Sequence, residues 1–155
     1  MYKVIIDTNI LINSSHDSFS YAWKVINLVL TGQVIAYASE KILKENNLIL
    51  DRILVNAKER QSFDLFLAQL VIAPVYHNVQ VIKHDSEDDK FINCALTVKA
   101  DYIITEDSHL LELEEYQGIQ MVTPTDFWFI YQGETKDEKA NREWTDWFKN
   151  VTRKK

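Results

Sequence analysis

The chain has 155 residues, of which 46% are apolar and 26% are charged, and it contains one Cys, three Gly and two Pro. This length predicts one domain whose core needs no covalent or metal support, and the single Cys excludes a disulfide framework or a zinc site built from several thiolates. The formal net charge of −6 argues against a basic nucleic-acid clamp, because binding to a phosphate backbone normally draws on clustered Lys and Arg.

Nothing in the sequence suggests a membrane segment. No apolar run reaches the roughly 18 residues of a membrane span, and residues 1–9 show neither the basic start nor the long apolar stretch of a signal peptide. We therefore expect a cytoplasmic protein that does not contact a membrane.

Short, continuously apolar runs alternate with segments of helical periodicity. The predicted buried strands are residues 3–6, 33–38, 79–82, 102–105 and 119–122. The predicted helices are residues 18–30, 39–55, 57–72, 87–99 and 108–113, followed by a short helix that begins at Pro124. This alternation predicts an α/β fold, a three-layer α/β/α sandwich around a central parallel sheet.

The composition changes after Tyr131. Residues 132–140 are polar and charged, and Trp144, Trp147 and Phe148 then follow at helical spacing. We expect a domain at residues 1–131, and at residues 132–155 a charged linker and an appended C-terminal helix. Its aromatic stripe has to cover its own domain, a second copy or a partner protein.

Acidic residues end two of the predicted strands. Asp7 follows the first strand, and Asp107 follows the run at 102–105. In open α/β sheets, ligands bind beyond the carboxyl ends of the strands, so both carboxylates are expected at the same edge. Helix capping would account for either residue taken alone.

Asp88 lies on the apolar face of the helix predicted at 87–99. At about 100° per residue it heads the stripe that contains Phe91 and Ile92, whereas Asp89 falls on the margin of that stripe. Acids at a helix start complement the macrodipole, which explains several of the acids here but not the inward facing of Asp88.

Glu45 lies on the apolar face of the helix predicted at 39–55, between Ile42 and Ile49. A carboxylate buried there without a partner is costly or becomes protonated, so Glu45 needs a cation or a hydrogen bond. A position at the boundary of the buried face, or an ion pair with Lys41 or Arg52, remains an equally good explanation.

Asp7, Glu45, Asp88 and Asp107 are thus predicted to meet at one edge of the sheet. Clustered carboxylates repel one another unless positive charge is present, and hard oxygen ligands predict Mg²⁺ or Mn²⁺ rather than zinc. Such a site is suited to hydrolysing phosphodiester bonds, with one of the acids accepting a proton from the attacking water. The four histidines share no metal-ligand spacing, so none is assigned to the site.

Four ordered blocks of the sequence resemble the PIN domain (PilT N-terminus) family, in its prokaryotic branch of toxin–antitoxin toxins. They are VIIDTN at 4–9, SEKILKE at 39–45, DSEDDKF at 85–91 and ADYIITED at 100–107. The run at 118–127 is also similar, so that the resemblance covers about residues 2–130. Ser86 and Glu106 depart from it, where the family has Pro and Gly, and Glu106 adds a bulky charge near the mouth of the site.

The resemblance implies a sheet of order 3-2-1-4-5 and a metal-dependent nuclease that acts on single-stranded RNA. It implies these site residues: the catalytic metal ligands Asp7, Glu45, Asp88 and Asp107, and the orienting residues Asn9 and Thr105.

From these features we expect a Mg²⁺- or Mn²⁺-dependent endoribonuclease, the toxin of a toxin–antitoxin system. Its expected partners are single-stranded RNA, an antitoxin protein and a second copy in a homodimer. The alternative is a catalytically weak PIN-fold module that binds proteins, which Glu106 favours. The absence of a Gly-rich phosphate loop argues against an NTPase.

Overall fold

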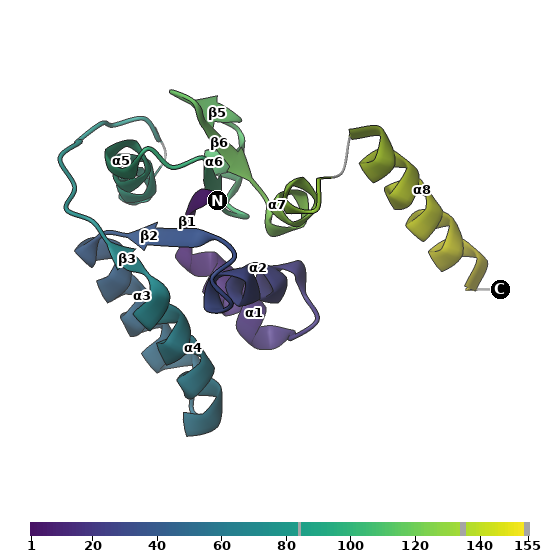
Figure 1. Cartoon of the computed structure of the whole chain (residues 1–155), viewed down its shortest axis with the longest axis horizontal. Coiled ribbons are helices and arrows are strands. Elements are labelled where there is room, and N and C mark those ends of the chain that lie inside the picture. Colours follow the sequence, from purple (N-terminus) through teal and green to yellow (C-terminus); the bar gives the residue numbers. More distant parts are fainter. Residues whose placement is uncertain (84, 134–135, 154–155) are drawn as a thin grey trace.

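Strand β1 (Lys3–Ile6) lies at the centre of the sheet, and the other elements are arranged around it (Figure 1). In this computed structural model, which describes residues 1–83, 85–133 and 136–153, β1 pairs in parallel with β2 (Ile35–Ala38) and β4 (Tyr102–Ile104). Val4 and Ile5 are fully buried and belong to two different core clusters, so both faces of the strand are covered.

Three further strands complete the sheet. Strand β3 (Val71–Ile72) pairs in parallel with β2, β6 (Ile119–Val122) pairs in parallel with β4, and β5 (Glu115–Tyr116) runs antiparallel to β6. The order is β3-β2-β1-β4-β6-β5. Its five parallel strands therefore follow the expected order 3-2-1-4-5, with one antiparallel strand added at the edge.

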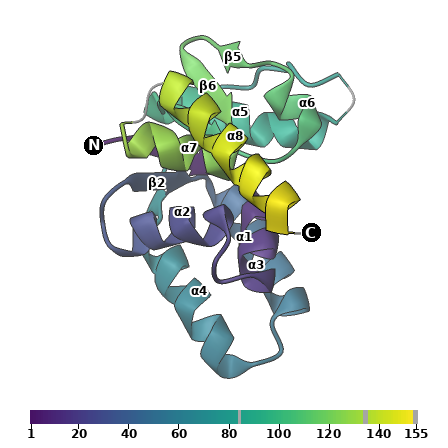
Figure 2. The same cartoon turned by 90° about the vertical axis from the view of Figure 1, so that its right-hand side faces the viewer.

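Helices cover both faces of the sheet, as the three-layer prediction requires (Figure 2). One face carries α1 (Thr8–His16), α2 (Tyr21–Leu30), α4 (Ala57–Gln69) and α7 (Pro124–Tyr131). The other face carries α5 (Asp89–Val98) and α6 (Ser108–Leu111), and α5 is preceded by the short 3₁₀ helix η1 (Ser86–Asp88). Helix α3 (Glu40–Ile53) contributes Leu50 to the first cluster and Ile42 to the second.

The prediction of a strand at residues 79–82 was wrong, and that run is a loop. Asp89 and Asn93 of α5 accept hydrogen bonds from the backbone N–H groups of Val79, Val81 and Ile82, so side chains satisfy donors that a strand would pair. The strand that pairs with β2 is instead β3. Residues 71–72 were predicted to belong to the preceding helix, but α4 ends at Gln69 and leaves them free to form this strand.

Helix α1 is missing from the predicted helix ranges, although Asp7 was considered as the cap of a following helix. The Asp7 side chain caps the helix by accepting a hydrogen bond from the Asn9 N–H group, and Ile10 and Leu11 are buried. The helix is short and carries polar Ser14 among its buried residues, which weakens the apolar periodicity that marks the longer helices.

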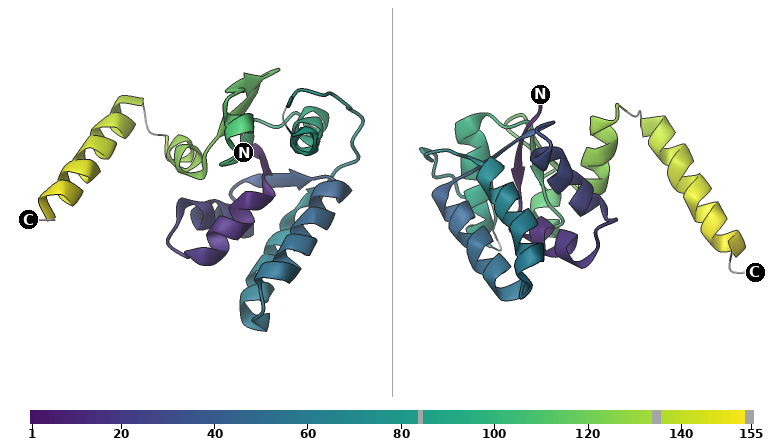
Figure 3. Two further views of the ribbon diagram at one scale, coloured as in Figure 1. Left: turned by 180° about the vertical axis from the view of Figure 1, so that it is seen from behind. Right: turned by 60° about the horizontal axis from the view of Figure 1, so that its bottom comes forward.

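Helix α8 (Lys136–Arg153) extends from α7 away from the sheet (Figure 3). It begins within the polar run at 132–140, and Trp144, Trp147 and Phe148 are all exposed. Arg142 contacts the main body, with its guanidinium 3.0 Å from the centroid of the Phe129 ring. Of the helices in the described ranges, none combines the length and apolarity needed to cross a membrane.

Phe127→Ala should destabilise the domain by about 3–5 kcal/mol, because the fully buried ring packs edge-on against Tyr2 and Tyr102 and its loss leaves a cavity. Urea denaturation would measure the change. Phe19→Ala is the matched control, because Phe19 is 89% exposed, and it should change the free energy of unfolding by less than about 0.5 kcal/mol. Equal effects of the two substitutions would contradict this placement of α7.

Candidate active site

Asp7, at the carboxyl end of β1, is buried and held in one orientation. Its Oδ2 accepts a hydrogen bond from Thr105 Oγ1 at 2.7 Å, and its Oδ1 accepts one from the Asn9 N–H group at 3.2 Å. Burial raises the pKa of Asp7 above its ordinary value, and the negative charges of Asp107 and Glu45 add to the rise, while the bond from Thr105 opposes it. Asp7 therefore lies in a negative field that its neighbours create.

Thr105 links the ends of two adjacent strands. It is fully buried, and its hydroxyl both donates to Asp7 and accepts a hydrogen bond from the Asp107 N–H group at 3.0 Å. One side chain therefore connects the Asp7 carboxylate to the backbone of Asp107. Asn9 differs, because it is exposed and its hydrogen bond to Asp7 comes from the backbone.

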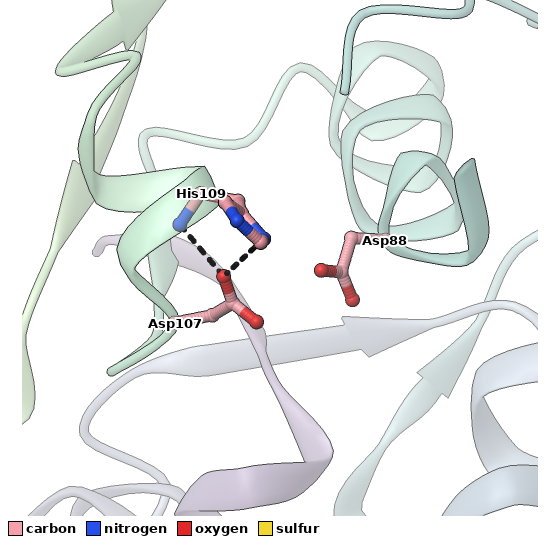
Figure 4. A group of neighbouring side chains, drawn as sticks. All are labelled: Asp88, Asp107 and His109. Carbon is pink, nitrogen blue, oxygen red and sulfur yellow. Dashed lines mark hydrogen bonds and ion pairs between the residues drawn. The ribbon is translucent and has the colours of Figure 1, made fainter. Parts of the chain in front are cut away.

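Asp107 follows β4 and caps α6. Its Oδ1 accepts a hydrogen bond from the His109 N–H group at 2.8 Å and lies 3.7 Å from Nδ1 of the same histidine. Figure 4 shows the side chains of Asp107 and Asp88 facing each other, with the His109 ring beside both. Asp107 thus lies between the end of β4 and the start of α6, with its carboxylate directed towards Asp88.

Asp88, the last residue of η1, directs its carboxylate towards this point without a donor to compensate it. It makes no capping hydrogen bond to α5, and its Oδ2 is buried with no hydrogen-bond partner among the residues described. Burial, followed by the negative charge of Asp107, raises the pKa of Asp88 to about 7. A buried carboxylate oxygen that faces other carboxylates is suited to coordinate a divalent cation.

Ligand atoms of Asp88, Asp107 and His109 all lie within 4.8 Å of one another. Bonds of about 2.0–2.6 Å from one ion would bridge these separations, so the residues present fit a divalent cation. His109 was not assigned to the site from the sequence. The signal that would have identified it is its position two residues after Asp107. At a helix start, the residue two after the capping Asp donates its N–H to that carboxylate and so lies beside it.

Glu45 lies beside this group but has a partner of its own. Its carboxylate forms an ion pair with Lys90 of α5, whose side chain is only 8% exposed. Lys41 and Arg52 were the partners expected from helical spacing, but Lys41 pairs with Glu87, at 3.6 Å. The true partner lies on a different helix, and a pairing of that kind depends on tertiary packing that helical spacing does not reveal.

Two neighbouring acids, Asp89 and Glu106, have hydrogen-bond partners of their own. Asp89, predicted at the margin of the apolar stripe, is only 5% exposed, and its Oδ1 anchors the loop at 81–82. Glu106 is exposed and accepts a hydrogen bond from Asn13 Nδ2 of α1 at 2.5 Å. The Glu106 carboxylate is therefore held by a hydrogen bond from α1.

Residues 3–109 match a family model whose description is PIN domain, and this span contains all four predicted acids and His109. The chain belongs to the PIN-domain family. PIN domains are generally nucleases, which agrees with a cluster of carboxylates at the carboxyl edge of a parallel sheet. The fold class and the strand order of the PIN resemblance are thereby confirmed.

Two further comparisons found proteins similar to this chain. The chain is 29% identical over 147 residues to the uncharacterized protein MJ1680 of Methanocaldococcus jannaschii, covering 85% of this chain and 92% of that protein. It also resembles the crystal structure of VapBC2 from Rickettsia felis bound to a DNA fragment from their promoter, with a TM-score of 0.53 and 12% identity. The alignment covers 77% of this chain and 96% of that chain, and at this identity it shows a shared fold.

Asp88→Asn should make the metal-free protein more stable, and the gain should grow as the pH rises. The folded-state pKa of about 7 lies above the ordinary value of 3.8, so the folded state holds a proton that the unfolded state has lost. Wild-type stability therefore falls as the pH rises from about 4 to about 7, and the amide removes this contribution.

Urea unfolding in EDTA at about pH 4 and about pH 8 would measure the gain. Asp146→Asn, at an exposed position on α8, is the matched control and should show no such change with pH. A gain from Asp88→Asn that is the same at both pH values would contradict the raised pKa.

Proposed function

We propose that this protein is a Mg²⁺- or Mn²⁺-dependent endoribonuclease that hydrolyses phosphodiester bonds in single-stranded RNA. The observation that carries the proposal is the buried, unpartnered oxygen of Asp88, facing Asp107 and His109 in a PIN-family chain. Repulsion within this group is relieved by a cation, and the chemistry such a cation supplies is activation of water and neutralisation of charge on the phosphate.

The residues of the chain have separate tasks in this proposal. Asp88 and Asp107 would hold the cation, with His109 as a third ligand, and Asp7 and Glu45 would add negative charge that draws the cation in. Thr105 fixes the orientation of Asp7 by donating a hydrogen bond to its Oδ2, while Oδ1 accepts the hydrogen bond from the Asn9 N–H group. The protein thereby pre-positions its acids before any ligand binds.

We further propose that the protein acts in the cytoplasm as the toxin of a toxin–antitoxin system. Support comes from the shared fold with VapBC2 and from the exposed aromatic residues Trp144, Trp147 and Phe148 on α8, a surface suited to an antitoxin or a second copy in a homodimer. In this view residues 1–131 form the nuclease domain and residues 132–155 the partner-binding tail.

Asp7→Asn and Asp107→Asn should each reduce cleavage of single-stranded RNA by about 10²-fold or more, because each removes a charge from a pre-positioned site. Excess EDTA should abolish cleavage by the wild type. Gel analysis of a labelled oligoribonucleotide with added Mn²⁺ would measure both effects, and Asp146→Asn should cleave at the wild-type rate. Cleavage that persists in EDTA or in Asp7→Asn would refute the proposal and favour contaminating nuclease or a non-catalytic binding module.

His109→Gln should weaken Mn²⁺ binding more than Mg²⁺ binding, because an imidazole ligand favours the softer ion. The increase in thermal denaturation temperature on adding each ion would measure the two affinities. His16→Gln, at an exposed position, serves as the control. Equal losses for both ions would exclude His109 as a direct ligand.

A further inference from the structure

A second recess lies next to the acidic site and takes no part in the function described so far. It has a volume of about 790 Å³, within the range of about 300–1,000 Å³ typical of small-molecule sites. It lies just beyond β2 and β3, where Ser39 and Ala73 follow the two strands, and it reaches the start of α5. In α/β sheets this edge is where ligands bind.

The outer wall of the recess is the loop between β3 and η1, and α5 holds that loop in place. Asn93 Oδ1 accepts a hydrogen bond from the Val79 N–H group at 2.8 Å. Asp89 Oδ1 accepts two, from Val81 and Ile82, each at 2.9 Å. Because the anchoring side chains of Asp89 and Asn93 are buried, the loop is held in a fixed position and the recess is part of the folded structure.

The recess and the acidic site share the same two helices. On α5, Lys90 lines the recess and also pairs with Glu45 of α3, while Asp88 immediately before α5 faces Asp107. On α3, Lys41 lines the recess one turn before Glu45. The recess and the acidic site are therefore adjacent along α3 and the start of α5.

The lining suits a nucleotide. Lys41 places a positive charge on one side, and its ion pair with Glu87 is exposed at both residues, so it is weak and readily exchanged for a phosphate. Lys90 also lines the recess, but it is paired with Glu45. His77 offers a ring for stacking and Asn78 offers hydrogen bonds, which are the groups that recognise splayed bases of single-stranded RNA. Apolar surface is supplied by Ile72, Pro74, Val75 and Val79.

We propose that this recess binds one unpaired nucleotide of the RNA substrate, next to the bond that is cleaved, with its base in the recess and its phosphate beside Lys41. This inference rests on the proposed ribonuclease function and adds to it a subsite for the base. It assigns substrate binding to the loop at residues 73–80, outside the acidic cluster.

Photo-crosslinking tests the subsite without requiring cleavage. A single-stranded oligoribonucleotide that carries 4-thiouridine is irradiated with the full-length protein, in EDTA and again in Mn²⁺, and the modified peptides are mapped by mass spectrometry. Crosslinks should fall within residues 73–80. Val75→Trp, which fills the recess, should reduce them by about tenfold or more, whereas Val55→Trp, at a position 99% exposed, should not.

A second pair of variants tests the phosphate contact and does not alter the loop. Lys41→Glu should weaken RNA binding several-fold in fluorescence anisotropy, and the effect should shrink at high salt. Lys44→Glu is the matched control, because it makes the same charge change at an exposed position on α3 that does not line the recess.

The outcomes separate the subsite from the catalytic proposal. Crosslinks that map elsewhere, no crosslinks at all, or equal effects within both variant pairs would overturn the subsite, and metal-dependent cleavage by the wild type would still support the nuclease. Crosslinks in residues 73–80 that Val75→Trp removes, in a protein that cleaves no RNA with any ion, would support the subsite and refute the nuclease.

Discussion

The hydroxyl of Thr105 makes the contacts on which the site depends. It donates to Asp7 at the end of β1 and accepts from the backbone of Asp107 at the end of β4, so two adjacent parallel strands present their acids in a fixed relation. Thr105 has no exposed surface, and these bonds are therefore not weakened by competition with water. The sheet thus holds the like charges of Asp7 and Asp107 close together at its carboxyl edge. A bound cation would relieve their repulsion.

Helix α5 meets this edge from the opposite side and combines several tasks within three consecutive residues. Asp88 faces the acids, Asp89 anchors the loop at 81–82, and Lys90 forms an ion pair with Glu45. Successive residues at a helix start point in directions about 100° apart, so one short segment reaches the acidic cluster, the loop and α3 at once. A shift of this helix start would disturb the acidic site and the neighbouring recess together.

The sequence was sufficient to predict the parallel sheet and the acids at its edge, because buried strands and inward-facing carboxylates leave local patterns. It failed where tertiary packing decides the outcome. Residues 79–82 are as apolar as a strand, yet Asp89 and Asn93 take their backbone hydrogen bonds. The partner of Glu45 and the approach of His109 to Asp88 both join segments that are distant in the chain, and no spacing rule within one helix predicts them.

Isothermal titration calorimetry of Mn²⁺ into the metal-free, full-length protein tests most directly whether the acidic cluster binds a cation. The carboxylates and His109 predict saturable binding at about pH 7, and the raised pKa of Asp88 predicts that protons are released as the ion binds, so the observed heat should vary with the ionisation enthalpy of the buffer. Asp88→Asn should weaken the binding and remove most of the proton release. An absence of saturable binding, or binding that Asp88→Asn leaves unchanged, would contradict a metal-dependent site at this edge of the sheet.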